Sequence, residues 1–163
     1  MGPLARSRYF RISVTDCCNM TCAFCHNEGQ GPVGKGVAAA LDVESIAWVA
    51  EIAFDEGFRK FKLTGGEPLI RPDICEVVSA LRAVGIQDLS IITNGSLLAR
   101  MASPLRDAGL GRVNVSLHSL DPYRFQSEFG SGPSLVQKIV TGIDAAISVR
   151  NVSMILEQMA ARV

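Results

Sequence analysis

The chain has 163 residues, which suits one domain with a buried core, and its Lys and Arg residues balance Asp and Glu at 16 each. Without a basic excess it has no charge field to hold a nucleic acid backbone or an anionic membrane surface. Its apolar runs are too short to span a bilayer or to form a secretory signal, so we expect a single cytoplasmic domain over residues 1–163 with no membrane segment.

Strand-like and helix-like segments alternate along the chain. Alternating apolar residues and turn signals predict strands at Tyr9–Val14, Lys60–Leu63, Leu89–Thr93, Val113–Leu117 and Val152–Leu156. Apolar residues at helical spacing predict helices at Asp42–Glu56, Pro72–Leu81, Leu98–Ala108 and Ser134–Ser148. The segment Gly29–Gly36 is expected to be flexible.

This alternation predicts an α/β fold with parallel strands, either a sheet or a barrel, because helical crossovers join parallel neighbours. In such folds the active site lies at the carboxyl ends of the strands. The unusual sequences fall at those ends: a cysteine-rich loop, Gly-Gly-Glu-Pro, Thr-Asn-Gly and Ser-Leu-His-Ser. We therefore expect these four segments to meet in one site.

Four of the five cysteines lie within nine positions after the first predicted strand. Cys18, Cys22 and Cys25 form the pattern C-x3-C-x2-C, which places three thiolates on a loop short enough to surround one compact centre. An odd cysteine count with this crowding suits metal binding in a reducing compartment better than disulfides. Three protein ligands leave a metal position open for a small molecule, as in an iron–sulfur cluster with one open iron.

The cysteines have three other interpretations. A structural zinc site needs four ligands, and His26 adjoins Cys25 too closely to serve easily as the fourth. The run Cys22-Ala-Phe-Cys25-His26 matches c-type haem attachment, a modification of exported proteins. An inert buried set fits poorly with the polar neighbours Asp16 and Asn19.

The motif C-x3-C-x2-C, with Phe24 before its last cysteine, resembles the radical S-adenosylmethionine (SAM) superfamily. The runs Tyr9–Asp16, Lys62–Arg71, Thr93–Gly95 and Asn114–Asp121 further resemble the molybdenum cofactor biosynthesis protein A family, the GTP 3′,8-cyclases. The resemblance runs from about Tyr9 to Ile147 and covers the N-terminal half to two-thirds of that family. It implies a partial (β/α) barrel of about five parallel strands, truncated before closure.

The resemblance implies two cofactors. Cys18, Cys22 and Cys25 would bind a [4Fe-4S] cluster whose open iron takes the amino and carboxylate groups of SAM. The pair would generate a 5′-deoxyadenosyl radical, and the enzyme would be a GTP-binding lyase of molybdenum cofactor biosynthesis.

Residues on the SAM side also follow from the resemblance. Phe24 would contact the adenine of SAM, and Gly65, Gly66 and Glu67 would receive its methionine amino group. Glycines permit close backbone approach, and carbonyl or carboxylate oxygens accept hydrogen bonds from an ammonium. Ser116 would form a further hydrogen bond to SAM. A strand-to-helix turn and a loop-capping serine are the structural alternatives for these stretches.

The resemblance places Arg11, Lys62 and Thr93 on the substrate side, the two bases facing GTP phosphates. A flavodoxin or ferredoxin would supply electrons. Cys17 and His118 receive no role, and Cys75 is expected to pack in the core.

The sequence departs from the cyclase family in three places. Ile92 stands where the family has Thr, His118 where many members have Asp, and no second cysteine triad follows Cys75. We expect a fragment, a truncated product or one half of a split protein, completed by a C-terminal half or another copy. The alternatives to a cyclase are an incomplete module that binds only the cluster and SAM, and a radical SAM enzyme of another pathway with a different substrate.

Overall fold

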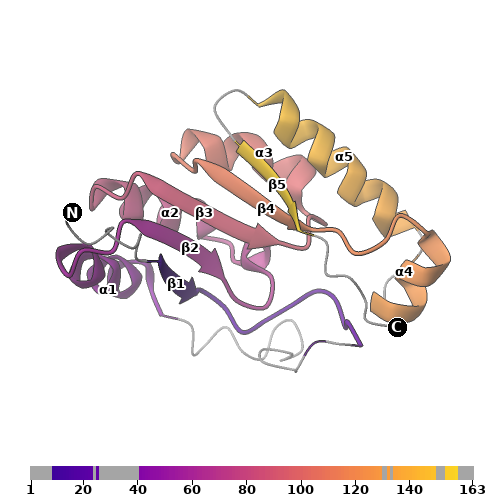
Figure 1. Cartoon of the computed structure of the whole chain (residues 1–163), viewed down its shortest axis with the longest axis horizontal. Helices are drawn as coiled ribbons and strands as arrows, with labels where there is room; N and C mark the ends of the chain where they lie inside the picture. Colours follow the sequence, from indigo (N-terminus) through magenta and orange to yellow (C-terminus); the bar gives the residue numbers. More distant parts are fainter. Residues whose placement is uncertain are drawn as a thin grey trace, which may run out of the picture.

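The computed structural model describes residues 9–23, 25, 41–129, 132 and 134–149, and the backbone of residues 153–157. Five strands and five α-helices make up these ranges (Figure 1). The strands are β1 (Tyr9–Ser13), β2 (Lys60–Thr64), β3 (Asp88–Thr93), β4 (Arg112–Ser116) and β5 (Ser153–Glu157). The helices are α1 (Val43–Asp55), α2 (Ile74–Ala83), α3 (Leu98–Asp107), α4 (Pro122–Phe129) and α5 (Ser134–Ser148), with a short 3₁₀ helix at Pro68–Ile70.

The five strands form one parallel sheet in the order β1-β2-β3-β4-β5. Each strand pairs with the next strand of the chain, which is the winding of a barrel and differs from the reversing order of a doubly wound sheet. Figure 1 shows the strands running the same way, with β1 and β5 at opposite edges. The predicted α/β fold, an unclosed partial barrel of about five parallel strands, is confirmed, and each strand lies within one residue of its predicted bounds.

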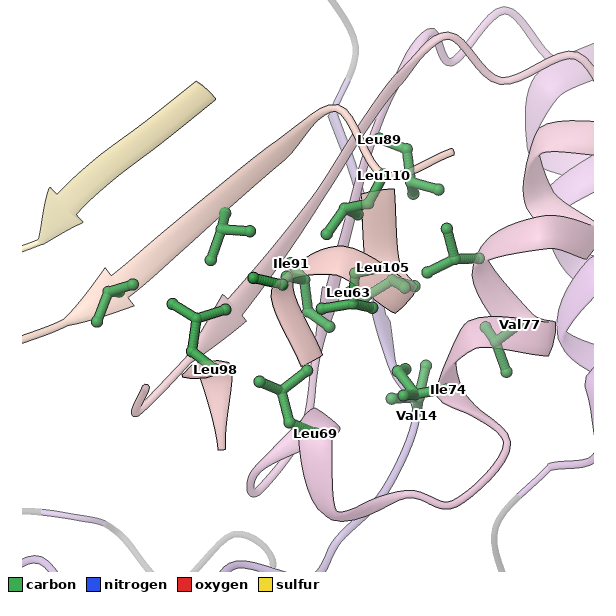
Figure 2. Packing of buried hydrophobic residues seen from close by; sticks show 14 of the residues in the cluster. Val14, Leu63, Leu69, Ile74, Val77, Leu89, Ile91, Leu98, Leu105 and Leu110 are labelled. Atoms are coloured by element: carbon green, nitrogen blue, oxygen red, sulfur yellow. The ribbon is translucent and has the colours of Figure 1, made fainter. Parts of the chain in front are cut away.

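The hydrophobic core lies between the sheet and its helices. Alternate strand residues, including Leu63, Leu89 and Ile91, are fully buried against the helices. Figure 2 shows these side chains packed together with residues of α2 and α3, among them Ile74, Val77, Leu98 and Leu105. Burying one such side chain stabilises the fold by roughly 1.5–3 kcal/mol. This apolar layer therefore holds in place the sheet whose strand ends carry the loops.

The opposite face of the sheet is polar, because successive side chains of a strand point to opposite sides. Arg11 of β1 pairs in register with Lys62 of β2, Lys62 with Ser90 of β3, and Ser90 with Arg112 of β4. One row of this face therefore carries three basic side chains. An ion pair of 2.6 Å joins Arg112 to Asp88.

Capping residues set the ends of two helices. Asp42 caps α1 as predicted, its Oδ1 accepting a hydrogen bond of 2.7 Å from the N–H of Ser45. Helix α4 was not predicted. It begins at Pro122, and Oδ1 of Asp121 accepts hydrogen bonds from the N–H groups of Tyr123 and Arg124 at 2.9 and 3.4 Å. Asp followed by Pro is a helix-start signal that could have revealed it.

Two sequence expectations concern residues outside the described ranges: the flexible segment Gly29–Gly36 and the position of Phe24. Across the described ranges, we find no helix with the length and apolar character that crossing a bilayer requires.

Candidate functional site

Four loops follow the carboxyl ends of β1 to β4, the ends to which the arrowheads point in Figure 1. They are the cysteine loop (described at residues 14–23 and 25), the Gly65–Glu67 turn, the Thr93–Ser96 turn and the segment after Ser116. Hydrogen bonds join the first three loops to one another, and the cysteine loop also contacts α4. The predicted gathering of these segments at one edge of the sheet is therefore present for the cysteine loop and the two turns.

The start of the cysteine loop lies against Gly65 and Gly66. The N–H of Gly66 donates to the carbonyl oxygen of Thr15 at 2.9 Å, and the N–H of Glu67 donates to that of Cys17 at 2.7 Å. A Cβ atom at Gly65 would overlap the Thr15 carbonyl oxygen, and one at Gly66 the Cys17 carbonyl oxygen. Gly65 also has φ +147°, in the range that favours glycine. Both glycines are thus required by close backbone contact with the cysteine loop.

The end of the cysteine loop is held by α4. The N–H of Ala23 donates to the carbonyl oxygen of Glu128 at 2.8 Å, and that of Thr21 to Phe129 at 3.4 Å. Carbonyl groups of the last turn of a helix have no partner within the helix, so they are available to accept these bonds. Helix α4, which sequence reasoning missed, therefore belongs to the site.

The three motif thiols influence one another electrostatically. Cys18 and Cys22 are half-buried and Cys25 is exposed. Burial raises the pKa of Cys18, with smaller contributions from the negative charges of Glu67 and Cys25. Burial, followed by the charges of Cys18 and Cys25, raises the pKa of Cys22 to about 11. Cys18 therefore lies near enough to sense the charge of Cys25, and Cys22 near enough to sense the charges of both.

The chemistry of this donor set fits a cluster better than a single ion. In the described part of the chain, no three His, Cys, Asp or Glu side chains are grouped as ligands of one metal ion. Cysteine thiolates are the ligands that hold iron–sulfur clusters, so the residue types of the triad fit such a group. Because thiolates are the ligands, binding must release the protons that the raised pKa values retain.

Glu67 joins the ends of β2 and β3. Its side chain is 1% exposed, and Oε1 accepts hydrogen bonds from the N–H of Leu69 at 3.0 Å and the hydroxyl of Thr93 at 2.6 Å. Oε2 accepts from the N–H of Asn94 at 2.7 Å. Burial raises the pKa of this carboxyl, although the three hydrogen bonds oppose the rise. The hydroxyl of Thr93 also accepts from the N–H of Gly95 at 3.0 Å, so it is engaged within the turns.

The other predicted site residues occupy the sheet. Ser116 ends β4 and is half-buried. Arg11 is exposed and Lys62 is 9% exposed, and both point to the polar face, where Lys62 Nζ lies 5.6 Å from the centre of the Tyr9 ring. Thr93 lies on the core face of β3, whereas the half-buried Ile92 points to the polar face. The structure thus brings Arg11 and Lys62 together but places Thr93 on the other side of the sheet.

His118, Cys17 and Cys75, for which the sequence predicted no role in the site, each contact neighbouring residues of the fold. The ring of His118 stacks on Phe129 at 5.3 Å between centroids, and burial lowers its pKa. Cys17 is buried, and its S–H donates to Oδ1 of Asp16 at 3.5 Å. Cys75 lies half-buried on α2 and packs against the core as expected.

Sequence reasoning missed Arg71. Its guanidinium is largely buried, forms a two-point pair with Asp73 at 2.6 and 2.9 Å, and donates to the carbonyl oxygen of Val14 at 2.7 Å. This bond holds the chain where β1 passes into the cysteine loop. Because Val14 precedes Arg71 by 57 positions, no local sequence pattern reveals the contact.

The sequence profile of the Radical SAM superfamily matches residues 12–158. The chain belongs to the radical SAM superfamily. Membership in this superfamily implies a [4Fe-4S] cluster and SAM as cofactors, and the cysteine loop is the part of the chain whose chemistry fits them.

Two similar relatives carry the same name. The chain is 46% identical over 136 residues to a probable GTP 3′,8-cyclase of Sulfolobus acidocaldarius, covering 83% of the chain and 42% of the relative. It is 40% identical over 144 residues to one of Methanocaldococcus jannaschii, covering 87% of the chain and 46% of the relative. The chain thus spans less than half the length of these relatives.

Two solved structures share the fold. HydG, a maturase of the [FeFe]-hydrogenase, superposes with a TM-score of 0.71 at 15% identity over 91% of this chain and 34% of its own. Streptococcus suis SuiB, in a structure bound to S-adenosylmethionine, gives 0.64 at 22% identity over 80% of this chain and 28% of its own. At these identities the likeness supports the fold alone.

Proposed function

We propose that the chain forms the cluster- and SAM-binding part of a radical SAM enzyme of the GTP 3′,8-cyclase type, a lyase of molybdenum cofactor biosynthesis. One observation carries the proposal: Cys18, Cys22 and Cys25 lie on a loop that contacts the Gly65–Glu67 turn at the carboxyl end of the sheet. The relatives named probable GTP 3′,8-cyclase support the choice of reaction.

In this proposal the thiolates of Cys18, Cys22 and Cys25 would hold the cluster, and SAM would bind beside it. Backbone carbonyls of Gly65 and Gly66, the hydroxyl of Ser116 and the ring or backbone of Phe24 contact SAM. When bound, the reduced cluster and SAM supply a 5′-deoxyadenosyl radical that takes a hydrogen atom from the substrate. The contribution of Glu67 is to hold the turns that carry these groups, because its own oxygens already accept three hydrogen bonds.

GTP is the proposed substrate, with its phosphates on the polar face of the sheet. The matched register of Arg11 and Lys62 supports this, since an anionic phosphate would be attracted by two basic side chains on neighbouring strands. Arg112 stands in the same row. Thr93, the third predicted substrate residue, would act through the Thr93–Ser96 turn, because its hydroxyl is bonded to Glu67.

We propose further that residues 1–163 form one radical SAM core domain that works with a C-terminal half or a second copy of the chain. A flavodoxin or ferredoxin would supply the electron. The described cysteines are all free thiols, which supports a reducing cytoplasmic location.

Anaerobic reconstitution with iron and sulfide, followed by dithionite and SAM, tests the proposal. We expect a brown protein that forms 5′-deoxyadenosine, with a changed rate when GTP is added. Cluster assembly without any 5′-deoxyadenosine would instead favour the incomplete binding module. A rate that does not respond to GTP would favour an enzyme with another substrate.

A further inference from the structure

Asn19 connects the cysteine loop to the end of β3 through its side chain. Its Nδ2 donates to Oγ of Ser96 at 3.0 Å, and its Oδ1 accepts from Nδ2 of Asn94 at 2.8 Å. One amide therefore uses both its donor and its acceptor across 75 to 77 positions of sequence. Asn19 directly follows Cys18, the first cysteine of the motif.

The partners of Asn19 are themselves held in place. Oδ1 of Asn94 accepts from the N–H of Ser96 at 3.0 Å, which closes the turn, and the N–H of Asn94 donates to the buried Glu67. Gly95 between them has φ +78°, a conformation that glycine adopts without strain. Asn94 thus presents a fixed donor to the loop, and Ser96 presents a fixed acceptor.

The position of this contact within the cysteine loop is informative. The loop's start is bonded to Gly66 and Glu67, and its end to the last turn of α4. Between these two attachments, within the described part of the loop, Asn19 is the residue whose side chain forms hydrogen bonds to the loop after another strand, β3. They hold the stretch that begins with Cys18 and precedes Cys22.

The backbone next to Cys18 gives this contact a chemical consequence. The backbone N–H groups of Met20 and Asn19 donate hydrogen bonds to the Cys18 sulfur. Hydrogen bonds to cysteine sulfurs are among the features that set the reduction potential of an iron–sulfur cluster. Without the Asn19 bonds, the backbone that carries these donors would lose its side-chain attachment to the end of β3.

We propose that Asn19 is a positioning residue, whose amide locks the Cys18–Cys22 stretch onto Asn94 and Ser96 and so fixes Cys18 with its N–H donors relative to β2 and β3. The cluster part of this inference rests on the proposed function. The locking of the loop is a property of this chain's own residues.

The first test measures hydrogen exchange in the chain without cluster. We expect Asn19→Ala to speed exchange of the Thr21 and Ala23 amides about tenfold, the effect of losing roughly one net hydrogen bond. Ser96→Ala should act in the same direction, and the double variant no more strongly than Asn19→Ala, because Asn19→Ala already breaks the bond that Ser96→Ala removes. Ser96→Thr, which keeps the hydroxyl, and Ser148→Ala, which removes an exposed hydroxyl on α5, should match the wild type.

The second test uses the reconstituted proteins and measures the cluster's midpoint potential and its electron paramagnetic resonance spectrum with SAM. We expect both to change in Asn19→Ala and Ser96→Ala and to return to the wild-type values in Ser96→Thr. Should Asn19→Ala fail to fold, Ser96→Ala breaks the same contact from the partner's side.

Two results overturn the inference: unchanged exchange in Asn19→Ala, or faster exchange with an unchanged potential and spectrum. A wild-type chain that takes up no cluster overturns the proposed function and the positioning role together. Unchanged exchange in the variant beside a normal wild-type cluster removes the positioning role alone.

Discussion

Glu67 is a buried residue with an ionisable side chain, a combination that is unfavourable without hydrogen-bond partners. A carboxylate that is 1% exposed is costly unless its oxygens are satisfied, and here three donors from two loops satisfy them. The same three bonds keep the Gly65–Glu67 turn beside the Thr93–Ser96 turn. A single buried side chain thus sets the distance between two of the loops that form the site.

Replacing Glu67 by Gln turns one acceptor oxygen into a donor, and we expect a loss of about 1–3 kcal/mol of unfolding free energy. Burial raises the pKa of Glu67 above its usual 4.5, so the folded protein keeps the proton where the unfolded chain has lost it. The stability advantage of the wild type over the variant therefore falls as pH rises from 4.5 through the raised pKa. Urea unfolding across this range, with the exposed Glu51→Gln as control, measures the difference. An advantage that grows with pH would contradict the argument.

The cysteines should differ sharply in their effect on cluster binding. We expect alanine at Cys18, Cys22 or Cys25 to remove most of the iron bound after anaerobic reconstitution, because two thiolates cannot hold the cluster in place. Cys75→Ala is the control, since this half-buried thiol packs against the core on α2. Iron and sulfide analysis gives the result. Equal loss from Cys17→Ala would show that the wrong cysteine has been assigned.

Gly66 tests how tightly the loops are packed. A Cβ at this position overlaps the carbonyl oxygen of Cys17, so Gly66→Ala must push the cysteine loop away. We expect a cost of about 1–3 kcal/mol in unfolding free energy, the usual range for overpacking. Gly132→Ala is the matched control, because an added Cβ there has nothing within 4 Å. Similar thermal unfolding of the two variants would mean that the loop yields without cost.

At the scale of elements, helix α4 has a role beyond covering the sheet. Phe125 and Phe129 bury one side of it, and its last carbonyl groups accept hydrogen bonds from the cysteine loop. A helix of eight residues is marginal by itself, so its cap and its packing decide whether it forms. The order of α4 and the order of the cysteine loop should therefore be linked.

Asp121→Ala tests this link by removing the side chain that accepts from Tyr123 and Arg124. We expect a loss of about 1 kcal/mol in stability, the usual cost of a lost N-cap. Exchange of the Ala23 amide should also become faster, because its acceptor is Glu128 of α4. Asp144→Ala, an exposed change on α5, serves as the comparison. Faster exchange in both variants, or in neither, would show that the order of the cysteine loop does not depend on the Asp121 cap of α4.

The sequence was sufficient for the elements that have long periodic patterns. The strands and the four longer helices can be predicted from apolar spacing alone, because the residues that face the core recur at regular intervals within each segment. Helix α4 was missed because its apolar face consists mainly of two phenylalanines, and the signal at Asp121 and Pro122 is short.

The site divides in the same way. The cysteine triad is evident from spacing because all its members lie on one loop. The bonds of Asn19 to Asn94 and Ser96, and of Arg71 to Val14, join residues far apart in sequence, which only the folded sheet brings together. The face of the sheet on which Thr93 lies depends on which strand residues point to the core. A motif of three residues does not determine this, because a shift by one residue moves every side chain to the opposite face.

For the whole molecule, the five parallel strands place the cysteine triad and the Gly65–Glu67 turn at one end of a sheet whose polar face carries Arg11 and Lys62. The groups proposed for SAM therefore come from loops at the strand ends, and those proposed for phosphates from the strands themselves. A substrate reaching from the polar face toward the cluster would connect them. How well this substrate is held decides whether a radical is used productively.

We expect the 163-residue chain, assayed alone with GTP, SAM and dithionite, to form 5′-deoxyadenosine without the cyclised GTP product. The residues proposed to bind SAM all lie within it, whereas its five cysteines supply one triad and lack the second one that the resemblance to the cyclase family leads us to expect. A misplaced substrate loses on the order of a hundredfold in rate per ångström, so the radical would be quenched elsewhere. Adding a separately produced C-terminal half of a cyclase relative should restore the product, with a heat-treated sample of that half as the control. Detection of the cyclic product by mass spectrometry from the chain alone would show that residues 1–163 hold GTP without further help.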